Sequence, residues 1–537
     1  MKKLMVFTAM FLGVLVAGFS QSDYAVHNTS SWIEAINGIR NGGNNQTYTI
    51  TVTGNISVPA SQESTFGPVT GITVTITGGG SLSTSNKGTL LVIGSEQTII
   101  AIELTLKGQN ANNAPLVIIA SNGTFRMEGK SSVSGNKNSG SSGGGGVYSK
   151  GTFTMQDSAS VSGNSASKGG GVYVGGGTFT LQGSASVSGN IASGGGWTNS
   201  GGGVYVEAGT FTMQGGTISG NTTVDGAGVY VGSGTFTLLD GIITNNSASN
   251  GGGGVGFEVG IFNMQGGSIS DNKSESCGGG VYGASGMGGR TGNFFMTDGT
   301  ISGNIAPDGA GVYNKGAFTM ENGSISKNIS SGKGGGVYAA GGSFTMQGGS
   351  ISGNIASTYG GGVFVNEDNP YNRVRFSKTG GTFFGFDSEP NLKNTVVSRL
   401  GHAVYKAGEK NWRNVTAGPT MNNDSYGFWL NDGDDKGDTV VTFPEKFAET
   451  RQRPNFKNIL TVTENTMKSN SSNTLWILQS VSGDSYTLKR SDAANTMTLV
   501  IKLGNFSGGR AFGGGSYSLV ISGDSGSGEN NWNGTWY

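Results

Sequence analysis

Short runs of alternating apolar and polar residues recur along most of this chain. One unit reads GGGVYV, a turn, GTFTMQGG, then SISGN and a second turn, and it returns about every 26 residues. Alternation with a period of two is typical of β-strands, so each unit predicts three short strands. In the second strand, Phe153 and Met155 fall on one face, and Thr152 and Thr154 fall on the other.

The repeat predicts an all-β fold, a right-handed parallel β-helix, because identical coils can stack with equivalent residues about 4.8 Å apart. One predicted interior ladder contains Phe153, Phe179, Phe211 and Phe236, and Phe383 fits as a degraded tenth copy. A second contains Asn164, Asn190 and Asn221, whose amides can hydrogen-bond their equivalents in neighbouring coils. A propeller needs about 40 residues per blade, and the Leu framework of leucine-rich repeats is missing.

The regions outside the repeat predict further parts. Residues 1–20 combine Lys2 and Lys3 with an apolar run and with small residues just before the predicted cleavage point. This is the pattern of a cleaved signal peptide. Residues 21–122 are expected to hold an N-terminal cap and irregular coils, and residues 123–430 the regular coils. From residue 440 to 537 glycine thins and longer alternating runs predict a small antiparallel β domain.

A short amphipathic helix is predicted to plug the open N-terminal end of the solenoid. Ser31 to Glu34 has the form of a capping box, which marks a helix start. Trp32, Ile33, Ile36 and Ile39 then recur at helical spacing. Terminal coils of a solenoid need such a cover.

The composition excludes several function classes. The chain has 33 basic and 33 acidic residues and no basic stripe, so a nucleic-acid partner is not expected. Two histidines and one cysteine cannot form a His/Cys metal cluster, and no motif indicates a cofactor. After signal cleavage no apolar stretch reaches membrane-spanning length.

Segments 218–230 (ISGNTTVDGAGVY) and 351–364 (ISGNIASTYGGGVF) resemble the paired repeats of the polymorphic outer-membrane protein family. Similar units occur in adhesin-like bacterial surface proteins. The resemblance covers about residues 123–405, although Ile or Val replaces the family's Phe and Gly mostly replaces its Ala. It implies a secreted or cell-surface location in a bacterium, outer membrane or extracellular, and an adhesive or structural role. We expect attachment to the envelope through an unknown partner.

An enzyme that acts on polysaccharides, a lyase or hydrolase, is the alternative function. Glycoside cleavage needs two carboxylates about 5–9.5 Å apart. Asp240 and Asp298 occupy the same position two coils apart, which is about 9.6 Å by strand spacing. No basic residue accompanies them, and an acid followed by glycine is also a common turn.

Binding of host or neighbouring-cell glycans or proteins is the function that we predict, with two candidate surfaces. If the flanking valines face inward, Tyr205 and Tyr230 belong to an outward aromatic strip; a self-stacked ladder is the alternative. Insertions at 283–292 and 366–380 emerge at the same corner, about three coils or ~14 Å apart. Their candidate binding residues are Arg290, Tyr371, Arg373 and Arg375.

Overall fold

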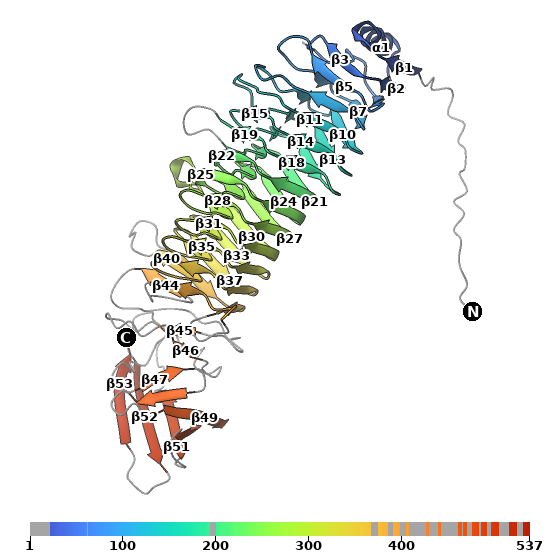
Figure 1. The fold of residues 1–537 in the computed structure, drawn as a ribbon. Helices are drawn as coiled ribbons and strands as arrows, with labels where there is room; N and C mark the ends of the chain where they lie inside the picture. The colour runs from blue at the N-terminus through green and yellow to red at the C-terminus, as the bar shows by residue number, and fades with distance from the viewer. Residues whose placement is uncertain are drawn as a thin grey trace, which may run out of the picture.

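Parallel strands stack into one elongated β-solenoid, which runs from β1 (Ser22–Val26) to β44 (Val404–Ala407) (Figure 1). The computed structural model describes residues 22–61, 63–193, 200–366, 374–384, 390–397 and 404–407, and strand segments between 426 and 536. The predicted leader, residues 1–20, lies outside the described residues. The predicted all-β parallel solenoid is therefore confirmed.

Each regular coil contributes strands to three parallel sheets. In one coil these are β16 (Val172–Val174), β17 (Thr178–Leu181), β18 (Ser186–Ser188) and β19 (Ile191–Ala192). The three strands predicted per repeat are thus confirmed. The fourth has only two residues, too short for an alternation signal, and the sequence did not reveal it.

Sheet 1 contains the Val-Tyr-Val strands and has 12 members. They are β6 (Leu91–Ile93), β9 (Val117–Ile119), β12 (Val147–Ser149), β16, β20 (Val204–Val206), β23 (Val229–Val231), β26 (Val255–Phe257), β29 (Val281–Gly283), β32 (Val312–Asn314), β36 (Val337–Ala339), β40 (Val363–Asn366) and β44.

Sheet 2 contains the Phe strands and the Ser-Ile-Ser strands. The Phe strands and their equivalents are β1, β2 (Thr47–Val52), β4 (Ile72–Thr77), β7 (Gln97–Ile102), β10 (Thr124–Glu128), β13 (Thr152–Met155), β17, β33 (Ala317–Met320), β37 (Ser343–Met346) and β41 (Arg375–Lys378). The Ser-Ile-Ser strands and their equivalents are β3 (Asn55–Val58), β5 (Ser81–Thr84), β8 (Thr105–Lys107), β11 (Ser132–Ser134), β14 (Ser160–Ser162), β18, β34 (Ser324–Ser326), β38 (Ser350–Ser352) and β42 (Thr382–Phe383). In four coils both runs form one strand: β21 (Thr210–Ser219), β24 (Thr235–Thr244), β27 (Ile261–Ser270) and β30 (Asn293–Ser302).

Sheet 3 is narrow and follows the asparagine corner. Its strands are β15 (Ser165–Ala166), β19, β22 (Thr222–Asp225), β25 (Ser247–Gly251), β28 (Lys273–Ser274), β31 (Ile305–Ala306), β35 (Ile329–Ser330), β39 (Ile355–Ala356) and β43 (Thr395–Val396).

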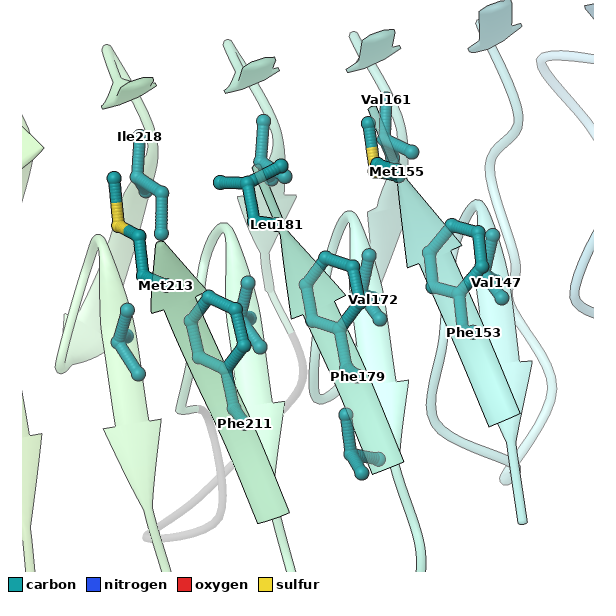
Figure 2. Close-up of a cluster of buried hydrophobic side chains, with 14 of the residues drawn as sticks. Val147, Phe153, Met155, Val161, Val172, Phe179, Leu181, Phe211, Met213 and Ile218 are labelled. Atoms are coloured by element: carbon teal, nitrogen blue, oxygen red, sulfur yellow. The ribbon is translucent and has the colours of Figure 1, made fainter. Parts of the chain in front are cut away.

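The interior is built from stacked identical side chains, as predicted. Phe153, Phe179 and Phe211 pair in register and point into the solenoid, beside Met155 and Leu181 (Figure 2). Along the regular phenylalanine column, neighbouring ring centroids lie 4.6 to 5.6 Å apart. Stacked aromatic rings at this spacing combine apolar burial with favourable ring contacts.

The tenth member of the phenylalanine column is Phe376, and the expectation for Phe383 was wrong. Phe344 pairs in register with Phe376, and the two rings lie 5.5 Å apart. Phe383 pairs with Ile351 and therefore belongs to the column of the Ser-Ile-Ser strands. The sequence misled because Phe383 sits in a run, GGTFFGF, that resembles the Phe strand.

The asparagine ladder is also confirmed. The side-chain Nδ2 of Asn164 donates to Oδ1 of Asn190, and that of Asn190 to Oδ1 of Asn221, at 3.1 and 3.0 Å. The ladder extends further than predicted, to Asn394, whose Oδ1 accepts from Asn354 Nδ2 at 2.8 Å. These asparagines are fully buried, so each satisfied amide avoids a desolvation cost of about 1–3 kcal/mol.

The N-terminal helix α1 (Thr29–Asn41) begins earlier than predicted. Asn28, not Ser31, is the N-cap: its side chain accepts from the Ser31 backbone N–H at 2.9 Å, and Ser31 Oγ accepts from the Asn28 N–H at 3.1 Å. Trp32, Ile36 and Ile39 are buried together with Ala35, whereas Ile33 is 43% exposed. Residues 32, 36 and 39 share one helix face, and position 33 does not.

Strands after residue 425 pair in the antiparallel direction. β45 (Tyr426–Phe428) pairs with β46 (Thr439–Val441). Seven further strands form an antiparallel sheet: β47 (Leu460–Thr463), β48 (Thr466–Ser469), β49 (Leu475–Ser482), β50 (Ser485–Arg490), β51 (Thr496–Leu503), β52 (Gly515–Gly523) and β53 (Asn530–Trp536).

Candidate functional site

The tyrosine column of sheet 1 is a stacked ladder from Tyr148 to Tyr230, and Gly256 separates it from the rings that begin at Tyr282. Tyr173, Tyr205 and Tyr230 lie in register, with ring centroids 5.1 and 5.5 Å apart. Tyr205 and Tyr230 are each only 8% exposed. Their valine neighbours face inward as expected, but the rings offer little surface for a ligand. The arrangement is the self-stacked alternative of the two that the sequence left open.

Glycine turns allow these rings to lie flat. A side chain added at Gly143 or Gly251 would meet the ring of Tyr173 or Tyr282 at 2.2 or 2.5 Å. Burial, together with the nearby carboxylates of Glu207 and Glu258, raises the pKa of Tyr205 to about 12. The ladder is therefore built to keep its hydroxyls neutral and its ring faces covered.

The two candidate catalytic carboxylates act as turn acceptors. Asp240 Oδ1 accepts the N–H of Gly241 at 2.7 Å, and Asp298 Oδ1 accepts that of Gly299 at 2.8 Å. Both glycines have a positive φ, 106° and 104°, so each acid shapes the bend within its strand. Strand β27 lies between the two. Within the described ranges, no group of three or more His, Cys, Asp or Glu is placed to hold a metal ion.

The four predicted loop residues do not form one described patch. Arg290 is exposed in a small hairpin, residues 284–292, where Ser285 pairs with Thr291. This hairpin contains the short 3-10 helix Met287–Gly289. Arg375 lies in strand β41 and pairs with Ser343, so it is not a loop residue. Tyr371 and Arg373 lie outside the described residues.

The outer face of sheet 2 carries four rows of outward residues in the eight coils from β13 to β37. The row before the phenylalanine contains Thr152, Thr178, Thr210, Thr235, Ile261, Asn293, Ala317 and Ser343. The row after it contains Thr154, Thr180, Thr212, Thr237, Asn263, Phe295, Thr319 and Thr345. The sequence position after the inward Met or Leu contains Gln156, Gln182, Gln214, Leu239, Gln265, Thr297, Glu321 and Gln347. The register is irregular here, and Asp240 and Asp298 pair with Gln214 and Gln265. The row before the inward Val or Ile contains Ser160, Ser186, Thr217, Ile242, Ser268, Thr300, Ser324 and Ser350.

Each of these rows is interrupted once by a large apolar residue, and all four interruptions fall on three consecutive strands, β24, β27 and β30. We call Leu239, Ile242, Ile261 and Phe295 the apolar patch. They are 39, 46, 38 and 36% exposed. Several exposed apolar side chains on neighbouring strands of one sheet face are a feature of interaction surfaces, whereas single scattered ones are not. Sequence reasoning did not identify the patch, although the departures are visible once the repeats are aligned.

The apolar patch is bordered by a raised element and by acids. At the corner that precedes β27, Val259 is 36% exposed, and a side chain added at Gly286 of the hairpin would meet Val259 Cγ2 at 2.9 Å. The hairpin therefore lies against Val259, two residues before Ile261 of the patch. At the bend within the strands, Asp240 and Asp298 are exposed.

A second set of exposed apolar residues differs in kind. Ile305, Ile329 and Ile355 pair in register on sheet 3 and are 47, 45 and 38% exposed. The same row also contains Ile191, which Thr222, Ser247 and Lys273 separate from Ile305. The three consecutive isoleucines are equivalent residues stacked in one row, whereas the apolar patch draws its residues from four rows.

No helix among the described residues is long and apolar enough to cross a membrane. Comparisons with protein-family models, curated proteins and solved structures find no match to this chain.

Proposed function

We propose that this chain is an exported surface protein with an adhesive or interaction role, and that the apolar patch is its binding surface. The observation that carries the proposal is the coincidence of four row interruptions on three neighbouring coils. Large exposed apolar residues contribute nothing to the solenoid interior. Their clustering is typical of a surface that a partner covers.

The carboxylate geometry gives less support to the polysaccharide-acting enzyme. Both candidate acids are already engaged by backbone N–H groups of their own turns. A general acid or base must be free to reach the proton that it transfers. An interaction role needs only a rigid scaffold and an uncovered patch.

The finer architecture belongs to the same proposal. Residues 1–20 would direct export, and the coils would wind in the right-handed sense, as in the passenger repeats that they resemble. Helix α1 would cover the first coil, and the strands after residue 440 would form a separate C-terminal domain. Attachment to the cell envelope would then come from a partner.

Cell fractionation with surface proteolysis tests the location. We expect the chain in the envelope or medium fraction and expect added protease to degrade it on intact cells. Adhesion is then compared between cells that carry the natural chain and a consensus variant, in which Leu239→Gln, Ile242→Ser, Ile261→Thr and Phe295→Thr restore the residues of neighbouring coils. Retention of the chain inside protease-treated cells, or equal adhesion, would contradict the proposal.

A further inference from the structure

We infer that the apolar patch binds an extended protein segment whose apolar side chains are accompanied by Lys or Arg. The inference rests on the proposed function, because it names the partner of the same surface. It follows from three properties of the patch: its place on paired strands, its aliphatic character and the sign of the charges beside it.

Ile261 and Phe295 lie on the regular part of the sheet face, before the bends at Gly241 and Gly299. Ile261 is in register with Asn293, so Phe295 lies one strand across and two residues further along. Strand spacing and rise place these two positions about 8 Å apart. An extended segment presents alternate side chains on one face about 6.7 Å apart, which is close to this separation.

The side chains favour a protein over a glycan. Three of the four patch residues, Leu239, Ile242 and Ile261, are aliphatic. Sugars are typically held by flat aromatic faces and hydrogen bonds, and the tyrosine rings that could provide such faces are covered in their ladder. Aliphatic surface gains its free energy by removing apolar partner groups from water, at about 25 cal/mol per Å².

The charges favour a basic segment. The charged residues of β24, β27 and β30 are Asp240 and Asp298, and these strands contain no Lys or Arg. Glu321, exposed in the next coil, extends the same acidic margin. A partner with Lys or Arg beside its apolar residues would complement this margin, whereas a partner with acids there would be repelled. Arg290, in the hairpin on the other side of the patch, would repel Lys or Arg of the partner. The basic residues of the partner are therefore expected on the side of Asp240 and Asp298.

Fluorescence anisotropy with two synthetic peptides tests this inference on the purified full chain. Both alternate Leu and Val with Thr; one carries Lys at its charged positions and the other Glu. We expect the Lys peptide to bind about tenfold or more tightly than the Glu peptide and to weaken as salt rises. Equal binding of the two peptides, or no binding of the Lys peptide, would overturn the inference.

Matched variants locate the binding. The consensus variant and the pair Asp240→Asn with Asp298→Asn should each weaken binding of the Lys peptide about tenfold, and the second should also remove the salt dependence. Asparagine keeps the side-chain oxygen that accepts the glycine N–H, so the turns are preserved. Ile329→Thr, on the sheet 3 stripe, is the control and should leave affinity unchanged. If Ile329→Thr weakens binding as much as the consensus variant does, the assigned surface is wrong.

The inference and the proposed function can fail separately. The peptide measurement uses purified protein and does not depend on cellular location. Surface proteolysis uses intact cells and does not depend on the charge of the partner. A chain that is reached by protease but prefers the Glu peptide would therefore contradict the inference alone.

Discussion

The outer faces of sheet 1 and sheet 2 are built by the same alternation and have opposite properties. On sheet 1 the outward row is tyrosine, and the rings stack on one another and on glycine turns until Tyr205 is 8% exposed. On sheet 2 the outward rows of these eight coils are mostly Thr, Gln and Ser, with Asn263, Asn293, Ala317, Glu321 and the apolar patch as the other residues, and their side chains are exposed or half-buried. An outward position in a strand therefore does not determine whether a side chain is available to a partner.

This difference separates structural from functional residues on the surface. The tyrosines are outward in direction but belong to a packed ladder, so removing one should destabilise the fold. The four residues of the apolar patch do not stack on identical residues in neighbouring coils, and each is at least 36% exposed. Changes in pH and matched substitutions on the two faces distinguish these two kinds of surface residue.

High pH should destabilise the sheet 1 face more than any single substitution. An unfolded tyrosine ionises near pH 10, whereas burial raises the pKa of Tyr205 to about 12 and raises those of Tyr173 and Tyr230 as well. The stabilisation is complete below about pH 10 and is lost as pH rises through the folded pKa, because only the unfolded chain has released its protons. Phenolate absorbance and denaturant unfolding, followed together from neutral pH upward, should change cooperatively. Titration of these tyrosines near pH 10 in a folded chain would contradict the closed ladder.

Tyr205→Ala should cost about 3 kcal/mol of unfolding free energy, because it removes a buried ring and its two stacking contacts. Thr212→Ala, on the open face of sheet 2, is the matched control and should cost about 1 kcal/mol or less. Urea unfolding monitored by circular dichroism gives both values. Similar losses for the two variants would show that the two faces do not differ in packing.

Gly226→Ala should be more costly than Gly163→Ala, although both glycines have a positive φ, 61° and 63°. A side chain at Gly226 would approach Val229 O at 2.6 Å and Tyr230 Cδ2 at 2.9 Å, whereas nothing lies within 4 Å of one at Gly163. We expect about 2–3 kcal/mol for Gly226→Ala and about 1 kcal/mol for Gly163→Ala. Thermal or urea unfolding measures the difference. Equal costs would mean that backbone strain alone, not contact with the tyrosine ladder, requires glycine at position 226.

Phe295→Thr should change the free energy of unfolding by no more than about 0.5 kcal/mol while weakening binding of the Lys peptide. Threonine already occupies this row in the next two coils, at Thr319 and Thr345. Phe294→Thr, one residue away and fully buried, should cost more than about 3 kcal/mol. A large loss of stability for Phe295→Thr would assign the apolar patch to the fold and not to a partner.

Much of the fold was readable because the repeat is local and its coils are nearly identical. Alternation placed Phe153 and Met155 inside, and the recurrence of Asn164, Asn190 and Asn221 predicted their amide ladder. The errors arose where local resemblance and spatial register disagree. Phe383 looks like a repeat phenylalanine but stacks on Ile351, and Arg375 was assigned to a loop but pairs with Ser343.

The candidate site was less accessible from sequence. The hairpin around Arg290 was visible as an insertion, and the turn role of Asp240 was visible as an acid followed by glycine. The apolar patch was not found, because each of its residues is an ordinary β-strand residue in its own strand. Only the alignment of all four rows brings the four departures together.

The period of the chain, the inward residues and their ladders could be predicted from the amino-acid sequence, because alternation and identical stacking depend on neighbours in one or two coils. Which outward residues are covered became visible only in the folded solenoid. Tyr205 is closed off by rings and glycine turns from other coils, whereas Phe295 stands open beside Asn263 and Thr319. Exposure depends on what the adjacent coils place around a side chain, and strand alternation carries no information about that.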